Sequence, residues 1–480
     1  MKILISLSLL VFLFSCTNEV DYSSAKWLAW DKDTVSNFPE QHWKKYKTPE
    51  DAGWSTKKLE EAKRFWQESQ SSAFLVIYDG AVLVSWGEID RRFLLHSAGK
   101  SISNGLFGIA VDEEIINPEA TLGELGVTDI VELTPLEKSA KLDDLFKFRS
   151  GVFIRGANSL IKDYPPRGSA KPGEKWFYNN WDLNVCTAIL EREWDKPIEL
   201  IFKERIADPL EMEHFRLTDI DEVFEPKRSK YPSHPGKYSA LDLARYSLLY
   251  LNNGKWKDQQ IISQDWIRES TYPHSELEDK DFGQGSDYGY NWWISDDRFK
   301  ELGMYNAQGI LGQRLRIIPK SDLVIVNLVN SYKRHNFKEE DQLELLGKIL
   351  AARVSKPINN PELIELETTP PTPLPTDSIT SRFLGKYTAP YRFDPELPTM
   401  DAIIEYTENG LIVDFQYGNP YKMIKVSDNT YIMEDMDLIE EKRFPMKFFI
   451  DENGKEAFEL ELAFVLDKVT FRKNENVDNK

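Results

Sequence analysis

The sequence predicts an α+β fold for most of the chain, followed by a small all-β domain. Strand-like segments at both ends of residues 48–355 enclose a helical middle, the pattern of an antiparallel sheet flanked by helices with an all-α insert. Residues 379–475 are short alternating segments separated by Asn-Gly and Asp-Asn turns, which indicates a β-sandwich or a small barrel. The proline-rich stretch 356–378 between them is predicted to be a semi-rigid linker.

Hydrophobic periodicity predicts the individual elements of the larger domain. Residues 73–78 and 82–86 form a strand hairpin around an Asp-Gly turn, and the apolar positions of residues 102–109 then recur at helical spacing. One further helix is predicted to end at residue 66, and others are predicted over 142–148, 183–190, 240–251, 264–269 and 339–354. Further strands are predicted over 288–293, 314–318 and 322–329.

The composition indicates a large, folded, acidic protein. The 480 residues suffice for about two to four domains. The 13 Trp, 20 Tyr and 26 Phe residues exclude disorder for the body of the chain. A net charge of −19 repels a phosphate backbone, so we expect no nucleic-acid partner.

The N-terminus resembles a bacterial lipoprotein signal. A charged start precedes an apolar run over residues 3–14, too short to span a bilayer, and Cys16 follows. The resemblance implies that residues 1–16 are the signal, that Cys16 carries lipid, and that 17–47 are a polar tether. The protein would be exported and held at the periplasmic face of the inner or outer membrane or at the cell surface. An ordinary secretory signal is the alternative. Cys186 then has no disulfide partner and is expected to pack as a small hydrophobe.

Ser97 and Lys100 form a Ser-x-x-Lys motif at the start of a predicted buried helix. They lie one turn apart on one face, so the amine can reach the hydroxyl. A serine hydroxyl is activated when a neighbouring base takes its proton, and a lysine amine kept neutral by burial can be that base. The same string occurs at Ser23–Lys26, in the tether, and at Ser55–Lys58, where Ser55 or Thr56 is predicted to cap a helix. The string alone favours a capping role for Ser97, and the residues downstream reverse that interpretation.

Two further motifs follow in order, namely Tyr178-Asn179-Asn180 and a glycine-bearing turn between strands at residues 308–313. With Ser97 and Lys100 they resemble the serine β-lactamase and penicillin-binding-protein superfamily, in the branch of class C β-lactamases and related esterases and peptidases. The resemblance covers residues 48–355 and implies the β-lactamase-like fold and a covalent acyl-enzyme. It implies these roles: Ser97 as nucleophile, Lys100 as its base, Tyr178 as a proton shuttle beside the lysine, Asn180 or Asn179 as a hydrogen-bond partner of the lysine or the substrate, and the N–H groups of Ser97 and of the strand near Ile310 as the oxyanion hole.

The third motif departs from the pattern of penicillin-recognising members, which place a cation there for the substrate carboxylate. Ala307-Gln308-Gly309 offers a neutral amide, with Arg314 and Arg316 further along the strand. Loss of a charge-assisted hydrogen bond favours ester or amide hydrolysis over β-lactamase or carboxypeptidase activity. Gly309 permits a close backbone approach. The other residues expected to line the cleft are Arg167, Trp181, Tyr290, Trp292, Gln308 and Gln313.

Other catalytic patterns fit less well. The segment around Ser97 nearly matches the elbow of α/β-hydrolases, but Leu95 occupies a position that needs a small residue. A Ser-His-Asp triad with His234, His274 or His335 is therefore a minor alternative, and His96 is expected to face away from the site. Ser427-Asp428-Asn429 matches a class A β-lactamase motif, yet it lies in the tail and is predicted to be a turn.

The sequence therefore predicts a lipid-anchored serine hydrolase without cofactor or metal, cleaving an ester or amide of a small molecule or of a D-amino-acid peptide. A ligand-binding or sensor lipoprotein that does not turn its ligand over is the alternative from another class. The C-terminal β domain is expected either to bind a glycan or partner or to act as a structural lid.

Overall fold

The computed structural model describes residues 37–277, 286–295, 299–331, 335–367, 383–390, 399–407, 410–415, 420–427, 429–433, 446–461 and 468–474. The predicted signal with Cys16, most of the tether and the proline run of the linker lie outside these residues. Within the described ranges, no helix is both long and apolar enough to cross a membrane.

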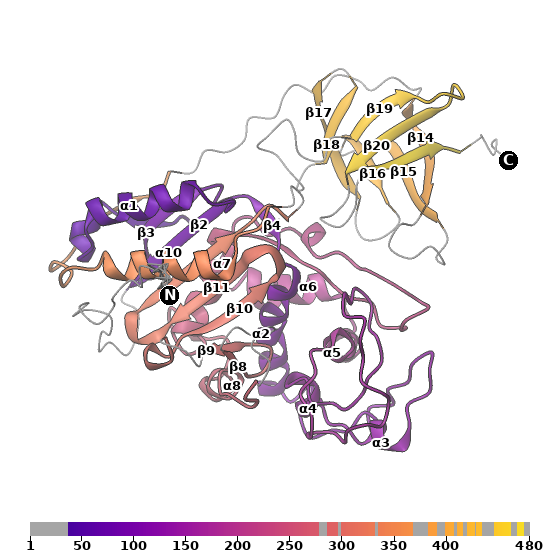
Figure 1. The fold of residues 1–480 in the computed structure, drawn as a ribbon, viewed down its shortest axis with the longest axis horizontal. Helices are drawn as coiled ribbons and strands as arrows, with labels where there is room; N and C mark the ends of the chain where they lie inside the picture. The colour runs from indigo at the N-terminus through magenta and orange to yellow at the C-terminus, as the bar shows by residue number, and fades with distance from the viewer. Residues whose placement is uncertain are drawn as a thin grey trace, which may run out of the picture.

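A nine-stranded sheet forms the centre of the larger domain (Figure 1), with the strand order β13-β1-β3-β2-β12-β11-β10-β9-β8. Its strands are β1 (Lys44–Tyr46), β2 (Ala73–Tyr78), β3 (Ala81–Gly87), β8 (Ser286–Tyr288), β9 (Trp293–Ser295), β10 (Tyr305–Gly309), β11 (Gln313–Ile318), β12 (Leu323–Leu328) and β13 (Leu363–Glu365). Neighbours pair antiparallel except β1 with β3. The hairpin β2–β3 joins the C-terminal strand β12 through β2, so strands from the two ends of the domain meet, as predicted.

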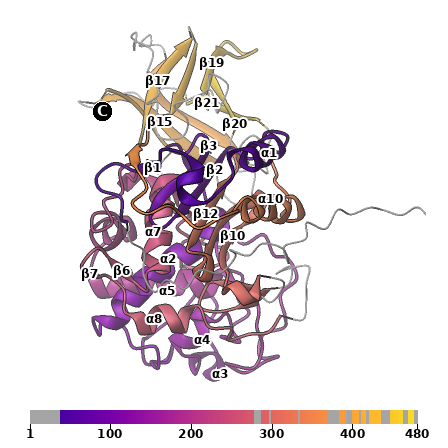
Figure 2. The ribbon, with the colours of Figure 1, turned by 90° about the vertical axis from the view of Figure 1, so that its left-hand side faces the viewer.

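Helices cover both faces of this sheet, because the side chains of β2 alternate between two cores. Leu75 and Ile77 belong to the core beneath α2 and α7, and Phe74 and Val76 belong to the core beneath α1 and α10. Figure 2 shows α1 and α10 on one side of the sheet and α2 and α7 on the other. The helices are α1 (Thr56–Gln67), α2 (Gly99–Asp112), α3 (Pro135–Lys138), α4 (Leu142–Phe146), α5 (Asn180–Trp194), α6 (Ile198–Phe202), α7 (Ala240–Leu251), α8 (Gln264–Ser270) and α10 (Glu339–Ala351). The all-α insert is the segment from α2 to α6, as predicted.

Two short strand pairs lie outside the sheet. β4 (Arg92–Leu94) pairs with β5 (Lys237–Ser239), and β6 (Lys255–Trp256) pairs with β7 (Gln259–Gln260). The strand β4 ends three residues before Ser97, so this pair helps to position the turn that carries Ser97.

Three boundaries differ from the sequence predictions. The strand expected over 288–293 is a hairpin of β8 and β9, whose turn contains Asn291 at φ 58°. The predicted tether and linker contain β1 and β13, which pair with each other and extend the sheet at its edge. A strand of three residues is too short to show an alternation of apolar and polar residues, so the sequence does not predict β1 and β13.

The C-terminal domain is a closed antiparallel barrel, one of the two predicted forms. Its strands are β14 (Gly385–Pro390), β15 (Thr399–Thr407), β16 (Gly410–Asp414), β17 (Tyr421–Ser427), β18 (Thr430–Met433), β19 (Met446–Ile450), β20 (Glu456–Glu461) and β21 (Lys468–Lys473). Pairing of β14 with β21 closes the barrel around a core that includes Tyr387, Phe458 and Phe471. Figure 1 shows it as a separate yellow body beside the larger domain. Of the Ser427-Asp428-Asn429 string, Ser427 ends β17 and Asn429 precedes β18, and Asp428 lies outside the described residues.

Candidate active site

Ser97 lies in a single turn of 3₁₀-helix, His96–Ala98, between β4 and the start of α2. The turn is fixed to β5 because Leu95 N–H donates to Gly236 O at 3.0 Å. Lys100 lies in the first turn of α2 and is only 8 % exposed. Its Nζ donates to Ser97 Oγ at 3.5 Å. The structure thus brings the amine and the hydroxyl of this Ser-x-x-Lys string together.

Tyr178 faces the same amine from the segment that precedes α5. Lys100 Nζ lies 4.9 Å from the centroid of the Tyr178 ring, a cation–π distance. The ring is buried, stacks on Trp293 at 6.0 Å and meets Phe148 edge-on at 4.9 Å. This aromatic cluster holds the phenol in one position relative to Lys100.

Asn179 and Asn180, the two candidates for the hydrogen-bond partner of Lys100 or the substrate, lie in different environments. Asn179 is buried and caps α5: its side-chain oxygen accepts from Trp181 N–H, and its Nδ2 donates to Val152 O at 2.8 Å. Asn180 lines the cavity that contains Ser97 and donates to Asn158 O at 2.8 Å. Asn180 therefore has access to a substrate, whereas Asn179 shapes the helix start.

The end of β10 closes against the turn that carries Ser97. A Cβ added to Gly309 would lie 2.3 Å from Leu95 O and 3.2 Å from Ala98 N, so only glycine fits at this distance. Gln308 and Ile310 line the cavity on either side of Gly309. The backbone of β10 consequently runs next to the turn that carries Ser97.

The cations of the third motif are committed to a carboxylate. Arg314 lines the cavity, but its Nε donates to Glu339 Oε2 at 2.8 Å, and Arg316 Nη2 donates to Glu339 Oε1 at 2.7 Å. Burial raises the pKa of Glu339, but the two guanidinium groups outweigh it and hold that pKa below its ordinary value. Arg314 and Arg316 share this one carboxylate, so Arg314 is held in an ion pair, and Gln308 is the neutral polar group of the motif.

The cavity has a volume of about 710 Å³ and is largely apolar. Seven residues expected at the site line it: Ser97, Lys100, Tyr178, Asn180, Gln308, Gly309 and Ile310. Leu106, Leu183 and Phe202 of the helical insert form part of its apolar wall. Pockets of this size accommodate a drug-sized molecule.

Several predicted lining residues lie elsewhere. Trp181 is buried and donates to Asp129, Trp292 is buried beside Asn104, and the Tyr290 hydroxyl donates to Asp143. Gln313 bonds to the backbone of Val329, and Arg167 pairs with Glu137. These five side chains are satisfied within the fold and do not line the cavity.

Other lining residues had no motif to identify them. Trp293 lines the cavity in place of its predicted neighbour Trp292, and Arg155 and Arg228 supply cations at the wall. Arg228 is paired with Glu225 at 2.8 Å. A one-residue difference in register separates Trp292 from Trp293, and such a difference is invisible in a single sequence.

Two of the histidines, His96 and His234, line the cavity. His96 adopts φ 51° and lines the cavity, contrary to the expectation that it faces away. Burial, with Lys100 nearby, lowers the pKa of His96 to about 3, so the ring is neutral above that pH. His234 also lines the cavity, and His274 stacks on Tyr290 at 4.7 Å. Within the described part of the chain, no three His, Cys, Asp or Glu residues are grouped to hold a metal ion.

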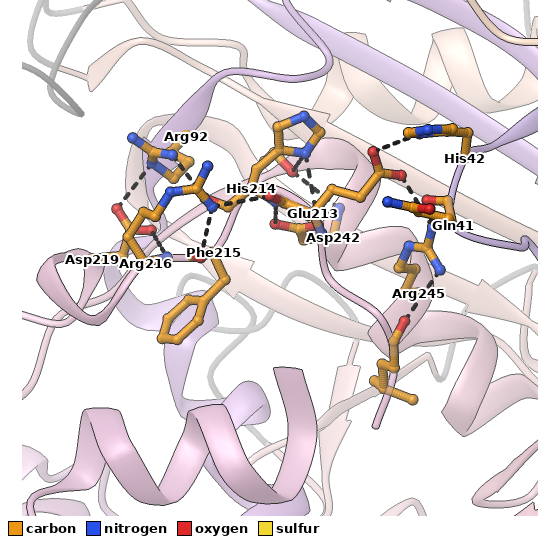
Figure 3. Close-up of polar contacts among 12 residues, drawn as sticks. Gln41, His42, Arg92, Glu213, His214, Phe215, Arg216, Asp219, Asp242 and Arg245 are labelled. Carbon is orange, nitrogen blue, oxygen red and sulfur yellow. Dashed lines mark hydrogen bonds and ion pairs between the residues drawn. The ribbon is translucent and has the colours of Figure 1, made fainter. Parts of the chain in front are cut away.

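A polar network links β4, residues 213–219 and α7 (Figure 3). Arg92 Nε of β4 lies 3.0 Å from Asp219 Oδ1, and Asp242 of α7 accepts from the backbone N–H of Glu213 at 2.9 Å and of His214 at 3.1 Å. Burial raises the pKa of Asp219 to about 6, although the neighbouring cations favour its charged form. The segment leading to β5 is thereby held against α7.

The partly buried carboxyl of Glu191, near the end of α5, is expected to make the stability of the protein depend on pH. Burial, with two nearby glutamates, raises its pKa to about 7, and its Oε1 accepts from Ile198 N–H at 3.0 Å. Because folding raises the pKa of Glu191, the contribution of this carboxyl to the free energy of unfolding is complete below about pH 4 and is lost as pH rises through 7. Glu191→Gln keeps the acceptor without the charge. At pH 8 we expect the variant to exceed wild type in unfolding free energy by about 1–2 kcal/mol, after allowance for partial exposure.

Urea unfolding followed by tryptophan fluorescence measures this difference, because every Trp of the sequence precedes residue 294 and the barrel contributes none. At pH 4 the variant and wild type should agree. Glu193→Gln, at the neighbouring exposed carboxylate, is the control and should change little at either pH. Equal stabilities of Glu191→Gln and wild type at pH 8 would contradict the prediction.

The sheet with its helical insert, and the Ser-x-x-Lys helix beside a buried tyrosine, define the class of β-lactamase-fold proteins. A sequence model of the family described as Beta-lactamase matches residues 57–348. The chain belongs to this family, whose members are generally serine hydrolases.

Solved structures similar to this chain carry related names. A beta-lactamase from Mycobacterium bovis is 18% identical, with 61% of this chain and 96% of that chain covered and a TM-score of 0.44. An octameric penicillin-binding protein homologue from Pyrococcus abyssi is 17% identical, with 86% and 97% covered and a TM-score of 0.45. A penicillin binding protein from Bacillus halodurans is 14% identical, with 60% and 98% covered and a TM-score of 0.45.

Proposed function

We propose that this protein is a serine hydrolase that cleaves an ester or amide of a small molecule or of a D-amino-acid peptide through an acyl-enzyme on Ser97. The observation that carries the proposal is the 3.5 Å hydrogen bond from the buried Lys100 amine to Ser97 Oγ inside the cavity. A lipid on Cys16, left as the first residue once the preceding signal is removed, would hold this hydrolase at a membrane.

The chemistry follows from the order of groups around Ser97. Lys100 takes the hydroxyl proton as Oγ forms a bond to the substrate carbonyl carbon. The N–H groups of Ser97 and Ile310 would stabilise the negative oxygen of the tetrahedral intermediate. As the intermediate collapses, the bond to the leaving group breaks, and the proton passes from Lys100 by way of Tyr178 to that group. Water then attacks the acyl carbon, gives its proton back to Ser97 through the same groups, and releases the acid.

The third motif favours a substrate without a carboxylate next to the reacting carbonyl. Gln308 presents a neutral amide, and Arg314 is paired with Glu339. A β-lactam carboxylate would therefore lack the charge-assisted hydrogen bond that a fixed cation supplies. Neutral esters and amides are the preferred class.

Intact-mass measurement after rapid mixing with p-nitrophenyl acetate tests the proposal. Wild type is expected to gain the mass of one acetyl group within seconds, and Ser97→Ala is expected to gain none. Ser55→Ala is the matched control because Ser55 belongs to the second Ser-x-x-Lys string and caps α1 instead. It should acetylate like wild type.

An acetyl adduct of equal yield in Ser97→Ala would remove Ser97 from the nucleophile role. Wild type that forms neither adduct nor product with a broad panel of esters and amides would favour the ligand-binding or sensor alternative.

A further inference from the structure

A tyrosine of the barrel reaches into the larger domain. Tyr421, the first residue of β17, accepts a hydrogen bond from Lys237 Nζ at 3.1 Å and donates one to Asp221 Oδ1 at 2.7 Å. Lys237 Nζ also lies 4.7 Å from the centroid of the Tyr421 ring and 3.4 Å from Asp221 Oδ2. Burial raises the pKa of Tyr421 well above its ordinary value, so the phenol keeps its proton and can donate to Asp221.

This contact lies on the strand pair that leads to Ser97. Lys237 of β5 pairs in register with Leu94 of β4, three positions before Ser97. Leu94, Tyr421 and Phe415 line the same cavity as Ser97. Lys237 is 1 % exposed, and Tyr421 lies over it. The barrel thus meets the larger domain at the wall of the candidate active site.

Two aromatic rings of the barrel form this part of the wall. Phe415 follows β16 and lies 6.3 Å from Tyr421 and 5.7 Å from Phe471 of the barrel core, measured between ring centroids. The barrel core therefore supports both rings from behind, and the Lys237–Asp221 pair fixes Tyr421 from the side of the larger domain. A wall fixed from both sides can select among substrates by shape.

We propose that the barrel is part of the substrate site, with Phe415 and Tyr421 as specificity-determining residues that contact the non-reacting apolar arm of the substrate. The inference rests on the proposed hydrolase function and deepens it. An acetyl group fills a small part of a 710 Å³ cavity, so the wall does not exclude longer chains. Together with Leu106 and Phe202 of the helical insert, this wall gives a longer acyl chain more apolar surface to contact.

The readout is the ratio of kcat/KM for p-nitrophenyl octanoate to that for p-nitrophenyl acetate, measured on the full chain. Tyr421→Ala and Phe415→Ala are each expected to lower this ratio by about tenfold, because each removes apolar contact that only the long chain uses. Phe415→Ala leaves the Lys237–Tyr421–Asp221 contacts in place, so it separates loss of the wall from loss of domain contact. Phe449→Ala, at a half-buried barrel ring outside the cavity, is the matched control and should keep the ratio within about twofold.

A second measurement does not depend on turnover. In a Ser97→Ala background, calorimetric titration with octanamide should give a Kd about tenfold higher after Tyr421→Ala or Phe415→Ala. A ratio and a Kd that stay within about twofold of the parent in both variants would overturn the inference, as would failure of octanamide to bind the parent. If wild type shows no turnover but octanamide binds the variants more weakly, the hydrolase proposal is overturned. The inference that Phe415 and Tyr421 contact the apolar part of a ligand is then still supported.

Discussion

Replacement of Lys100 by methionine is expected to lower kcat/KM for p-nitrophenyl acetate by about 10⁴-fold, the upper end of what one general base contributes. Lys100 is the group placed within hydrogen-bond distance of Ser97 Oγ, and it is 8 % exposed. Methionine has a similar length and fits against the Tyr178 ring, so the variant should fold. It cannot accept a proton, so the loss should appear in kcat.

The matched control is Lys58→Met. Lys58 stands in the second Ser-x-x-Lys string, where its Nζ donates to Ala351 O at 2.9 Å on the surface. This variant should keep the wild-type kcat/KM. Retention of more than about a tenth of wild-type activity in Lys100→Met would assign the base to another group, and His96 in the cavity wall would be tested next.

Gly309→Ala is expected to lower kcat by about 10²- to 10³-fold and the free energy of unfolding by about 1–3 kcal/mol, because its Cβ would meet backbone that has to move. The backbone of Gly309 is extended, with φ −125°, so alanine is not strained there by conformation. Its Cβ would lie 2.3 Å from Leu95 O, so β10 and the Ser97 turn must move apart. Misplacement of a reacting group or of one oxyanion donor has effects of this size.

Gly126→Ala separates activity from stability. A Cβ at Gly126 meets open space, but its φ is +66°, so alanine is strained there by conformation. We expect a loss of about 1 kcal/mol of stability with unchanged kcat. Steady-state kinetics and urea unfolding of both variants provide the comparison. Wild-type kcat in Gly309→Ala would show that β10 does not constrain the nucleophile.

The parts of the fold with clear periodicity were predictable. The β2–β3 hairpin and α2 follow from alternation, an Asp-Gly turn and apolar residues at helical spacing, and the structure confirms them. The closeness of Ser97 and Lys100 follows from the same helix, because one turn separates them. Order along the chain then singled out this string from the other two, one of which caps α1.

Side-chain direction was not predictable at single-residue resolution. Successive residues of a helix point about 100° apart, so Asn180 faces the cavity while Trp181 points into the core. A motif locates the helix start but leaves this rotation undetermined for its neighbours. Trp292 and Trp293 also lie in different environments, here because Trp293 begins the strand β9, in which successive side chains point to opposite faces.

The contact between the barrel and the larger domain could not be predicted from the sequence either. Tyr421 opens a strand of the barrel, where an aromatic residue is ordinarily read as core. Its partner Lys237 lies 184 positions earlier, and neither belongs to a motif. The expectation of a glycan-binding module or a structural lid therefore did not include a barrel that lines the cavity containing Ser97.

The edge pair β1–β13 has a mechanical consequence. The pair is antiparallel, with Lys44 opposite Glu365, so the chain before β1 and the chain leading to the barrel depart from the same end of the two strands. Tension between an anchored N-terminus and the barrel would peel these strands apart one residue pair at a time, instead of shearing them together. The strands β11 and β10, which contact the Ser97 turn, lie further inside the sheet and would bear load only after that edge had opened.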